Sequence, residues 1–138
     1  MEGVHGLHGY VALVTLLALV VYVWMFMRVG SARQRTGIEA PAVTGHPEFE
    51  RHFRIQANTL EGLIVFLPSL WLFALYLSEV IAAAFGLLWV IGRVMYMLSY
   101  AKDPKSRSAG FGVQALATLA LLFGALGAVV WSLLKTAI

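Results

Sequence analysis

Four long apolar stretches within 138 residues constrain this chain more than any other feature. A helix needs about 20 mainly apolar residues to cross a bilayer, and it must satisfy its backbone polar groups internally. The composition agrees, because 60% of the residues are hydrophobic and only 12% are charged, whereas soluble domains carry about a quarter charged residues. The sequence therefore predicts an all-α integral membrane protein, a single domain over residues 1–138 with helices over about 7–28, 47–78, 80–101 and 107–135.

Basic residues gather in the first and third connections between these helices. The first connection holds Arg28, Arg33, Arg35, Arg51 and Arg54, and the third holds Lys102, Lys105 and Arg107. The positive-inside rule places both connections in the cytoplasm and both termini on the non-cytoplasmic side. This multi-pass topology suits a bacterial inner membrane and an endoplasmic reticulum equally well, so both stay open.

Two rows of polar residues lie at helical spacing beside apolar runs. Arg51, Arg54, Asn58 and Glu61 form the first row, and Arg93, Tyr96 and Tyr100 form the second. Residues three or four positions apart share one face of a helix. Charged side chains at membrane depth almost always face a protein interior or a wet cavity. The rows therefore indicate either a binding site or interhelical ion pairs, such as one between Arg93 and Glu61.

The chemistry of the rows suits a small zwitterion with more than one carboxylate. Arginine binds carboxylates bidentately, Glu61 can hold an ammonium group, and Asn58 offers both a donor and an acceptor. Gln56 lies two positions from Arg54, about 200° around the helix, and cannot serve the same cavity from the same chain. If Gln56 also binds the ligand, the pocket must lie between subunits.

Several other functions find little support in the sequence. The chain has no cysteine, so a thiol in any reaction must come from a substrate. His5 and His8 do not match a ligand set of known spacing, and no metal site is expected. The basic residues flank membrane helices, which favours contact with membrane lipids over nucleic acid.

Small residues mark the fourth predicted helix. It contains Gly110, Gly112, Gly124 and Gly127. Glycines of this kind let helices approach closely in lipid. Packing within one chain and contact between subunits are both compatible with this pattern.

Two segments resemble signatures of the MAPEG family, the membrane-associated proteins in eicosanoid and glutathione metabolism. The first is Glu48-Phe49-Glu50-Arg51-His52-Phe53-Arg54-Ile55-Gln56-Ala57-Asn58, followed by Glu61, and the second is Arg93-Val94-Met95-Tyr96, followed by Tyr100 and Arg107. The sequence is most similar to the branch of leukotriene C synthase and microsomal glutathione transferase 2. The resemblance implies a homotrimer of four-helix subunits that binds glutathione, as a co-substrate, between neighbouring chains.

The resemblance also implies roles for individual residues. Glutathione would be bound by Arg33, Arg54, Gln56, Asn58, Glu61, Arg93, Tyr96 and Tyr100, with Gln56 contributing to the site of the adjacent subunit. Arg107 would be the catalytic residue that activates the glutathione thiol, since a permanent cation favours the thiolate. Pro104 is expected to end the third helix and Ser106 or Ser108 to cap the fourth. Arg107 would then lie near a helix N-terminus, whose dipole favours an anion.

The activity implied is that of a membrane-bound glutathione S-transferase that conjugates lipophilic electrophiles from the bilayer. The same thiolate could serve a glutathione-dependent peroxidase acting on lipid hydroperoxides. The alternative is a non-enzymatic lipid-binding or lipid-presenting protein of the lipoxygenase-activating type. Gly62 and Gln34 stand where the leukotriene-forming relatives carry a tyrosine and an arginine, which leaves the electrophile open.

Overall fold

Four long helices make up the computed structural model, which describes residues 8–137. They are α2 (Gly9–Thr36), α3 (Pro47–Tyr76), α4 (Glu79–Lys102) and α5 (Ser108–Ala137), and the short 3-10 helix η1 (Pro104–Ser106) joins the last two. Each long helix, α5 together with the η1 turn before it, is long and apolar enough to cross a membrane. The prediction of an all-α protein with four candidate membrane spans is confirmed.

One helix is longer than the sequence predicted. The first helix was expected to end near residue 28, but α2 continues through Thr36. The apolar run ends near residue 28, but the polar residues that follow are compatible with helical structure, so the helix continues past the apolar run. The helix ends at Gly37, whose φ of 74° is left-handed and whose N–H donates to the Arg33 carbonyl. Glycine adopts this conformation without steric cost.

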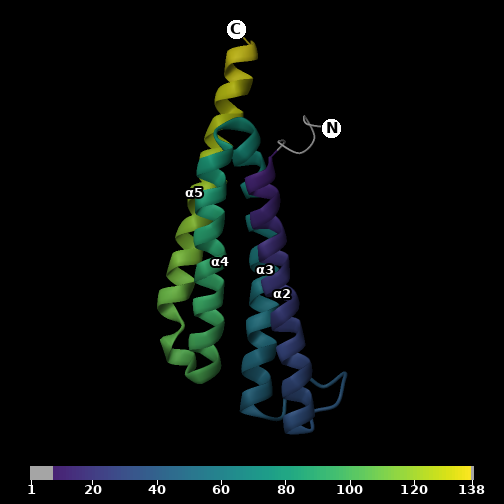
Figure 1. The fold of residues 1–138 in the computed structure, drawn as a ribbon. Coiled ribbons are helices and arrows are strands. Elements are labelled where there is room, and N and C mark those ends of the chain that lie inside the picture. The colour runs from purple at the N-terminus through teal and green to yellow at the C-terminus, as the bar shows by residue number, and fades with distance from the viewer. Residues whose placement is uncertain (1–7, 138) are drawn as a thin grey trace.

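The helices lie side by side in two pairs, α2 with α3 and α4 with α5 (Figure 1). The tight turn between α3 and α4 lies at one end, where the Ser78 side chain accepts a hydrogen bond from the Ile81 N–H at 3.2 Å. The 37–46 loop and the η1 connection lie at the other end, called here the loop end, where the two pairs diverge (Figure 1). The two connections rich in basic residues therefore share one end of the bundle.

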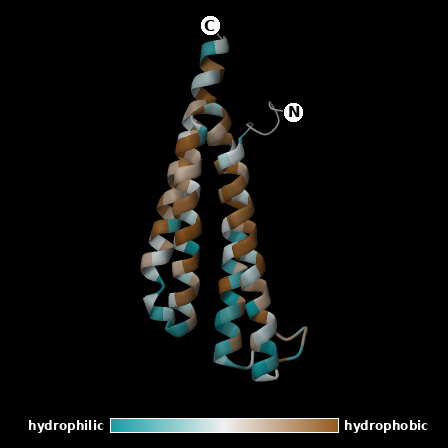
Figure 2. Ribbon diagram, in the orientation of Figure 1, coloured by the Kyte–Doolittle hydropathy of each residue, from teal (hydrophilic) through white to brown (hydrophobic). Residues whose placement is uncertain are grey.

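The surface of the bundle is apolar away from the loop end. Leu13, Ile64 and Leu116 are each more than half exposed, and hydrophilic residues gather near the loop end (Figure 2). In the interior, the Phe66 ring of α3 stacks on the Trp89 ring of α4 with centroids 4.2 Å apart. The exposed apolar side chains suit a lipid environment, whereas in water they would form an unusually large apolar surface.

Two glycines bring the backbones of α4 and α5 into contact. A methyl group at Gly92 would lie 2.8 Å from the Gln114 nitrogen, and one at Gly110 would collide with the backbone nitrogen of Tyr96. Gly124 instead packs against the side-chain ring of Phe73 on α3, whereas Gly112 and Gly127 have no described atom within 4 Å of an added methyl group. The glycines of α5 therefore divide, two packing within the chain and two facing outward.

We expect Gly110→Ala to destabilise the protein, because the added methyl group would force α4 and α5 apart. Overpacking of this kind costs about 1–3 kcal/mol of unfolding free energy, and the thermal midpoint in detergent should fall. Gly112→Ala is the matched control and should leave the midpoint unchanged or slightly raised, since alanine is the better helix former. Equal effects of the two substitutions would contradict the close approach at Gly110.

Candidate functional site

A polar cavity of about 490 Å³ opens between α3, α4 and the start of α5. It is lined by Arg54, Asn58, Tyr96, Tyr100, Arg107, Ser108 and Phe111. Five of the nine residues predicted as a site thus surround one cavity, although they come from α3, α4 and the turn that precedes α5. We call it the polar cavity below.

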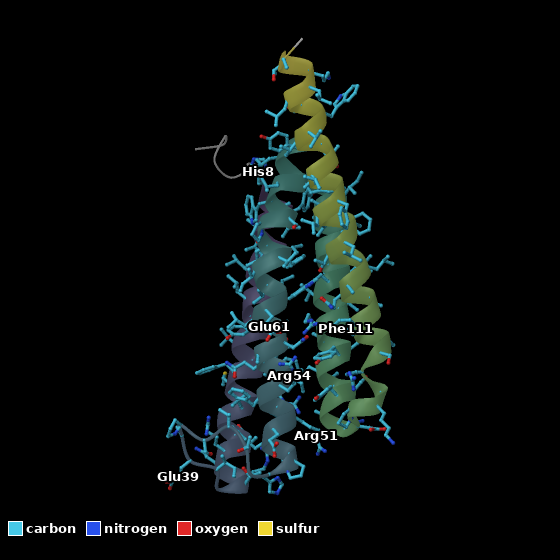
Figure 3. The ribbon with its side chains drawn as sticks, turned by 180° about the vertical axis from the view of Figure 1, so that it is seen from behind. His8, Glu39, Arg51, Arg54, Glu61 and Phe111 are labelled. Atoms are coloured by element: carbon cyan, nitrogen blue, oxygen red, sulfur yellow. The ribbon has the colours of Figure 1, made fainter. Side chains whose placement is uncertain are left out.

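A second cavity of about 320 Å³ adjoins the first, since Asn58 and Phe111 line both. Its other lining residues are Glu61, Gly62, Val65, Arg93, Gln114, Ala115, Thr118 and Leu119. Figure 3 shows Phe111 on α5, across from Arg54 and Glu61 on α3. We call this second cavity the apolar cavity below. It is lined by two more of the predicted site residues, Glu61 and Arg93, and most of its other lining residues are apolar.

Arg93 is the most buried charged side chain in the described part of the protein, with 1% of its surface exposed. Its Nη1 atom donates to Asn58 Oδ1 at 2.9 Å and to Thr59 Oγ1 at 3.1 Å. The guanidinium also lies over the Tyr96 ring, 4.5 Å from its centroid. These contacts join α4 to α3 through a permanent cation.

Within residues 8–137, no carboxylate forms an ion pair with Arg93. The predicted alternative of a pair between Arg93 and Glu61 is wrong, because Glu61 Oε1 lies 3.7 Å from Arg54 Nη1 instead. The Nε atom of Arg93 is buried and has no hydrogen-bond partner among the described residues. Because a buried cation is costly without a counter-charge, this arrangement favours an anionic ligand.

The bond from Arg93 also orients Asn58. Since Asn58 Oδ1 accepts from the guanidinium, its amide nitrogen is left as a donor for the cavities that Asn58 lines. An asparagine amide can donate two hydrogen bonds. Arg93 therefore fixes the polarity that Asn58 presents to a ligand.

Arg107 lies at the mouth of the polar cavity. Its Nη1 atom donates to the Pro104 carbonyl at 2.7 Å, and its guanidinium lies 5.9 Å from the centroid of the Tyr100 ring. The Arg107 carbonyl accepts from the Phe111 N–H at 3.1 Å, so Arg107 precedes the first turn of α5. The side chain is thus exposed beside a helix N-terminus, where an anion is favoured.

The predicted capping of α5 by a serine is wrong. Ser106 Oγ instead donates to the carbonyls of Ser99 and Asp103, at 3.0 and 2.7 Å. Ser108 is the first residue of α5 and forms no cap. The η1 turn after Asp103 sets the position of Arg107 instead.

Arg33 and Gln56 line neither of these cavities. Arg33 lies near the end of α2, where its Nη1 atom donates to the Ala42 carbonyl of the 37–46 loop at 2.9 Å and its guanidinium lies over the Phe49 ring of α3. Gln56 Nε2 donates to the Tyr22 hydroxyl at 3.4 Å, so it faces α2, on a different side of α3 from Arg54. The helical spacing predicted this separation of Gln56 from the cavity of its own chain.

Arg51 also departs from the predicted row. It lines a separate cavity with residues of α2 and the end of α4, although Arg54 and Glu61 follow it along α3 (Figure 3). Arg51 lies in the second turn of α3, near the loop end, where its neighbours differ from those of Asn58. The spacing of residues along α3 could not predict which residues of the other helices lie beside each of them.

The lining or supporting residues that the sequence did not predict are all uncharged, and three of them stand out. Thr59 accepts from Arg93, Phe111 lines both cavities, and Gln114 of α5 is 6% exposed in the apolar cavity. Gln114 could have been found from the sequence, because it is a polar amide within an otherwise apolar helix. Within the described residues, no three side chains of His, Cys, Asp or Glu are arranged to hold a metal ion, and His5 lies outside that part of the chain.

The fold and these cavities define a four-helix integral membrane protein with a polar site that opens into an apolar chamber. Residues 11–127 match the MAPEG family, and the chain belongs to that family. It is 43% identical over 122 residues to the uncharacterized protein sll1147 of Synechocystis sp., covering 88% of this chain and 89% of that one.

Two further relatives have names that state an activity. Human microsomal glutathione S-transferase 2 is 39% identical over 120 residues, which cover 84% of this chain and 80% of the relative. Bovine leukotriene C4 synthase is 36% identical over 117 residues, which cover 84% and 78%. The resemblance to the MAPEG family predicted from the motifs is confirmed.

We expect Asn58→Leu to lower the free energy of unfolding by about 2 kcal/mol, because Arg93 loses a charged hydrogen bond. The double variant Asn58→Leu with Arg93→Met should recover most of that loss, since an apolar side chain replaces the buried charge. Denaturation of the single and double variants in detergent gives the coupling energy. Additive effects would show that the two side chains do not depend on each other.

Proposed function

We propose that this protein is a membrane-bound glutathione S-transferase that conjugates lipophilic electrophiles. The observation that carries the proposal is the convergence of seven side chains, from α3, α4 and the turn before α5, on two adjoining cavities. They are Arg54, Asn58, Glu61, Arg93, Tyr96, Tyr100 and Arg107. The names of two relatives, a glutathione S-transferase and leukotriene C4 synthase, support the same chemistry.

The charges of the site complement glutathione, which carries two carboxylates, one ammonium group and one thiol. Arg54 and Arg93 supply cations for the carboxylates, and Glu61 supplies an anion for the ammonium group. The amide of Asn58, oriented by Arg93, adds a donor. Binding by several fixed groups limits the entropy lost at the reactive step.

Arg107 is the residue proposed to activate the thiol. A thiol with an ordinary pKa of about 8.5 is mostly protonated at neutral pH, and a permanent cation beside it favours the thiolate. Arg107 is free of any carboxylate partner within residues 8–137, and its guanidinium lies near the Tyr100 ring at the cavity mouth. The start of α5 adds the favourable end of a helix dipole.

In the proposed transferase reaction, the thiol proton leaves to solvent and the thiolate attacks an electrophilic carbon. The new S–C bond forms as the leaving group departs with its electron pair, or as an epoxide C–O bond opens and its oxygen takes a proton from water. In the peroxidase reaction, the thiolate attacks the terminal hydroperoxide oxygen, and an S–O bond forms as the O–O bond breaks, which gives a glutathione sulfenic acid and a lipid alkoxide. The alkoxide takes a proton from water and leaves as the lipid alcohol, and a second glutathione converts the sulfenic acid to a disulfide and water.

The apolar cavity is proposed to hold the lipophilic electrophile. Val65, Leu119 and Phe111 give it an apolar wall that begins where the polar cavity ends. A lipid electrophile could enter from the bilayer, while glutathione enters from the aqueous phase at the loop end. The two substrates would meet beside Asn58 and Phe111, which line both cavities.

The proposal includes a homotrimer in which each site lies between neighbouring chains. Gln56 and Arg33 face away from the cavities of their own chain, so they could complete the site of an adjacent subunit. The loop end with its basic residues would face the cytoplasm, with both termini on the opposite side. Either a bacterial inner membrane or an endoplasmic reticulum suits this orientation.

We expect Arg107→Gln to abolish the ultraviolet thiolate band of bound glutathione at neutral pH, while glutathione still binds. The value of kcat/KM with a lipophilic electrophile should fall about 100-fold, as when one preorganised electrostatic contact is removed. Lys105→Gln removes the same charge two residues away, outside both cavities, and should change neither quantity. Absence of both the band and glutathione binding in the wild type would favour the lipid-presenting alternative.

Mixing two inactive variants tests whether sites form between subunits. Arg107→Gln disables the cavity of its own chain, and Gln56→Leu is expected to disable the site of the neighbour. Trimers reassembled from both should regain activity, because roughly a quarter of the interfaces then join two intact halves. If the mixture is no more active than either variant alone, Gln56 does not serve an adjacent site.

A further inference from the structure

A separate basic cavity of about 510 Å³ lies at the loop end of the bundle. It is lined by Arg28, Arg35, His46, Pro47, Glu48, Arg51, His52, Leu98, Ala101 and Lys102. It shares no residue with the polar or the apolar cavity. The proposed transferase reaction therefore assigns no role to these side chains.

The charges in this basic cavity are unbalanced. Three arginines and one lysine, from α2, α3 and α4, line it: Arg28, Arg35, Arg51 and Lys102. Among the described lining residues, Glu48 is the only carboxylate. Glu48 already accepts from Arg35, with Oε1 at 2.7 Å from Nη2 and 2.8 Å from Nε. Among residues 8–137, Arg28, Arg51 and Lys102 therefore have no carboxylate partner.

One polar group in the lining is also buried without a partner. The Nε atom of Arg51 is buried and, within residues 8–137, lacks a hydrogen-bond partner. Because buried polar groups in proteins are nearly always hydrogen-bonded, this donor indicates a ligand that accepts hydrogen bonds. The His52 side chain beside it is 5% exposed.

We propose that the basic cavity binds a phosphate group, supplied by the headgroup of an anionic membrane phospholipid. Guanidinium groups match phosphate oxygens in geometry and charge, and basic pockets between membrane helices on the cytoplasmic side bind anionic headgroups. Leu98 and Ala101 of α4 give the cavity an apolar side, which suits the glycerol and acyl portions of a lipid. A soluble phosphate shares the anionic chemistry but lacks the apolar portion.

Such a ligand would hold three helices together at the loop end. Arg28 belongs to α2, Arg51 to α3 and Lys102 to α4. Their mutual repulsion would be offset by one bound anion, as a counter-charge favours crowded cations. The binding should weaken as ionic strength rises, because salt screens these charges.

The test is a calorimetric titration of the full chain in detergent with dihexanoyl phosphatidylglycerol, dihexanoyl phosphatidylcholine and inorganic phosphate. We expect phosphatidylglycerol to bind most tightly, and Arg51→Gln to weaken it about tenfold or more, as expected for a lost charged contact. Lys102→Gln, at an exposed position, should weaken binding in the same direction without affecting the fold. Lys105→Gln lies outside the cavity and should leave the affinity unchanged.

The pattern of binding across probes and variants distinguishes a lipid site, a soluble phosphate site and diffuse surface charge. Tight binding of inorganic phosphate that is weakened by Arg51→Gln but not by Lys105→Gln would retain the phosphate site and assign it a soluble ligand. Equal losses in Arg51→Gln and Lys105→Gln would indicate diffuse surface charge and overturn the proposal, as would no binding of any probe. Glutathione binding in Arg51→Gln should stay unchanged, so a failure here is distinguishable from a failure of the transferase proposal.

Discussion

The buried guanidinium of Arg93 is the interaction on which the rest of the site depends. It joins α4 to α3 through Asn58 and Thr59 and lies against the ring of Tyr96. A permanent charge with 1% exposure in an apolar bundle is costly, and no carboxylate in the described chain offsets it. The hydrogen bonds to Asn58 and Thr59 stabilise the buried charge, and a bound anion would supply the missing counter-charge.

Backbone packing around this cation sets the shape of the two cavities. The close approach at Gly92 and Gly110 holds α5 directly against Tyr96, which places Phe111 and Arg107 beside the side chains of α3 and α4. The side of the site near the loop end is therefore polar, and the side toward Val65 and Leu119 is apolar. The proposed transferase reaction needs both surfaces within reach of one reactive atom.

The sequence predicted the helices well, because apolar length is a local property. It placed the end of the first helix too early, since α2 continues through polar residues to Thr36. It grouped Arg54, Asn58 and Glu61 correctly, because they share a helix, but it could not assign partners between helices. Arg93 binds Asn58 rather than Glu61, and Arg51 lines another cavity, because side-chain reach and depth decide these contacts. The sequence offers little indication that uncharged residues such as Gln114 line the site.

An experimental structure of the protein with S-hexylglutathione bound would test the proposed site. We expect the tripeptide in the polar cavity, with its sulfur beside Arg107 and the hexyl chain passing Phe111 toward Leu119. The carboxylates should lie near Arg54 and Arg93. A tripeptide bound in the basic cavity around Arg51, or a hexyl chain directed away from Phe111, would show that the polar and apolar cavities are not the transferase site.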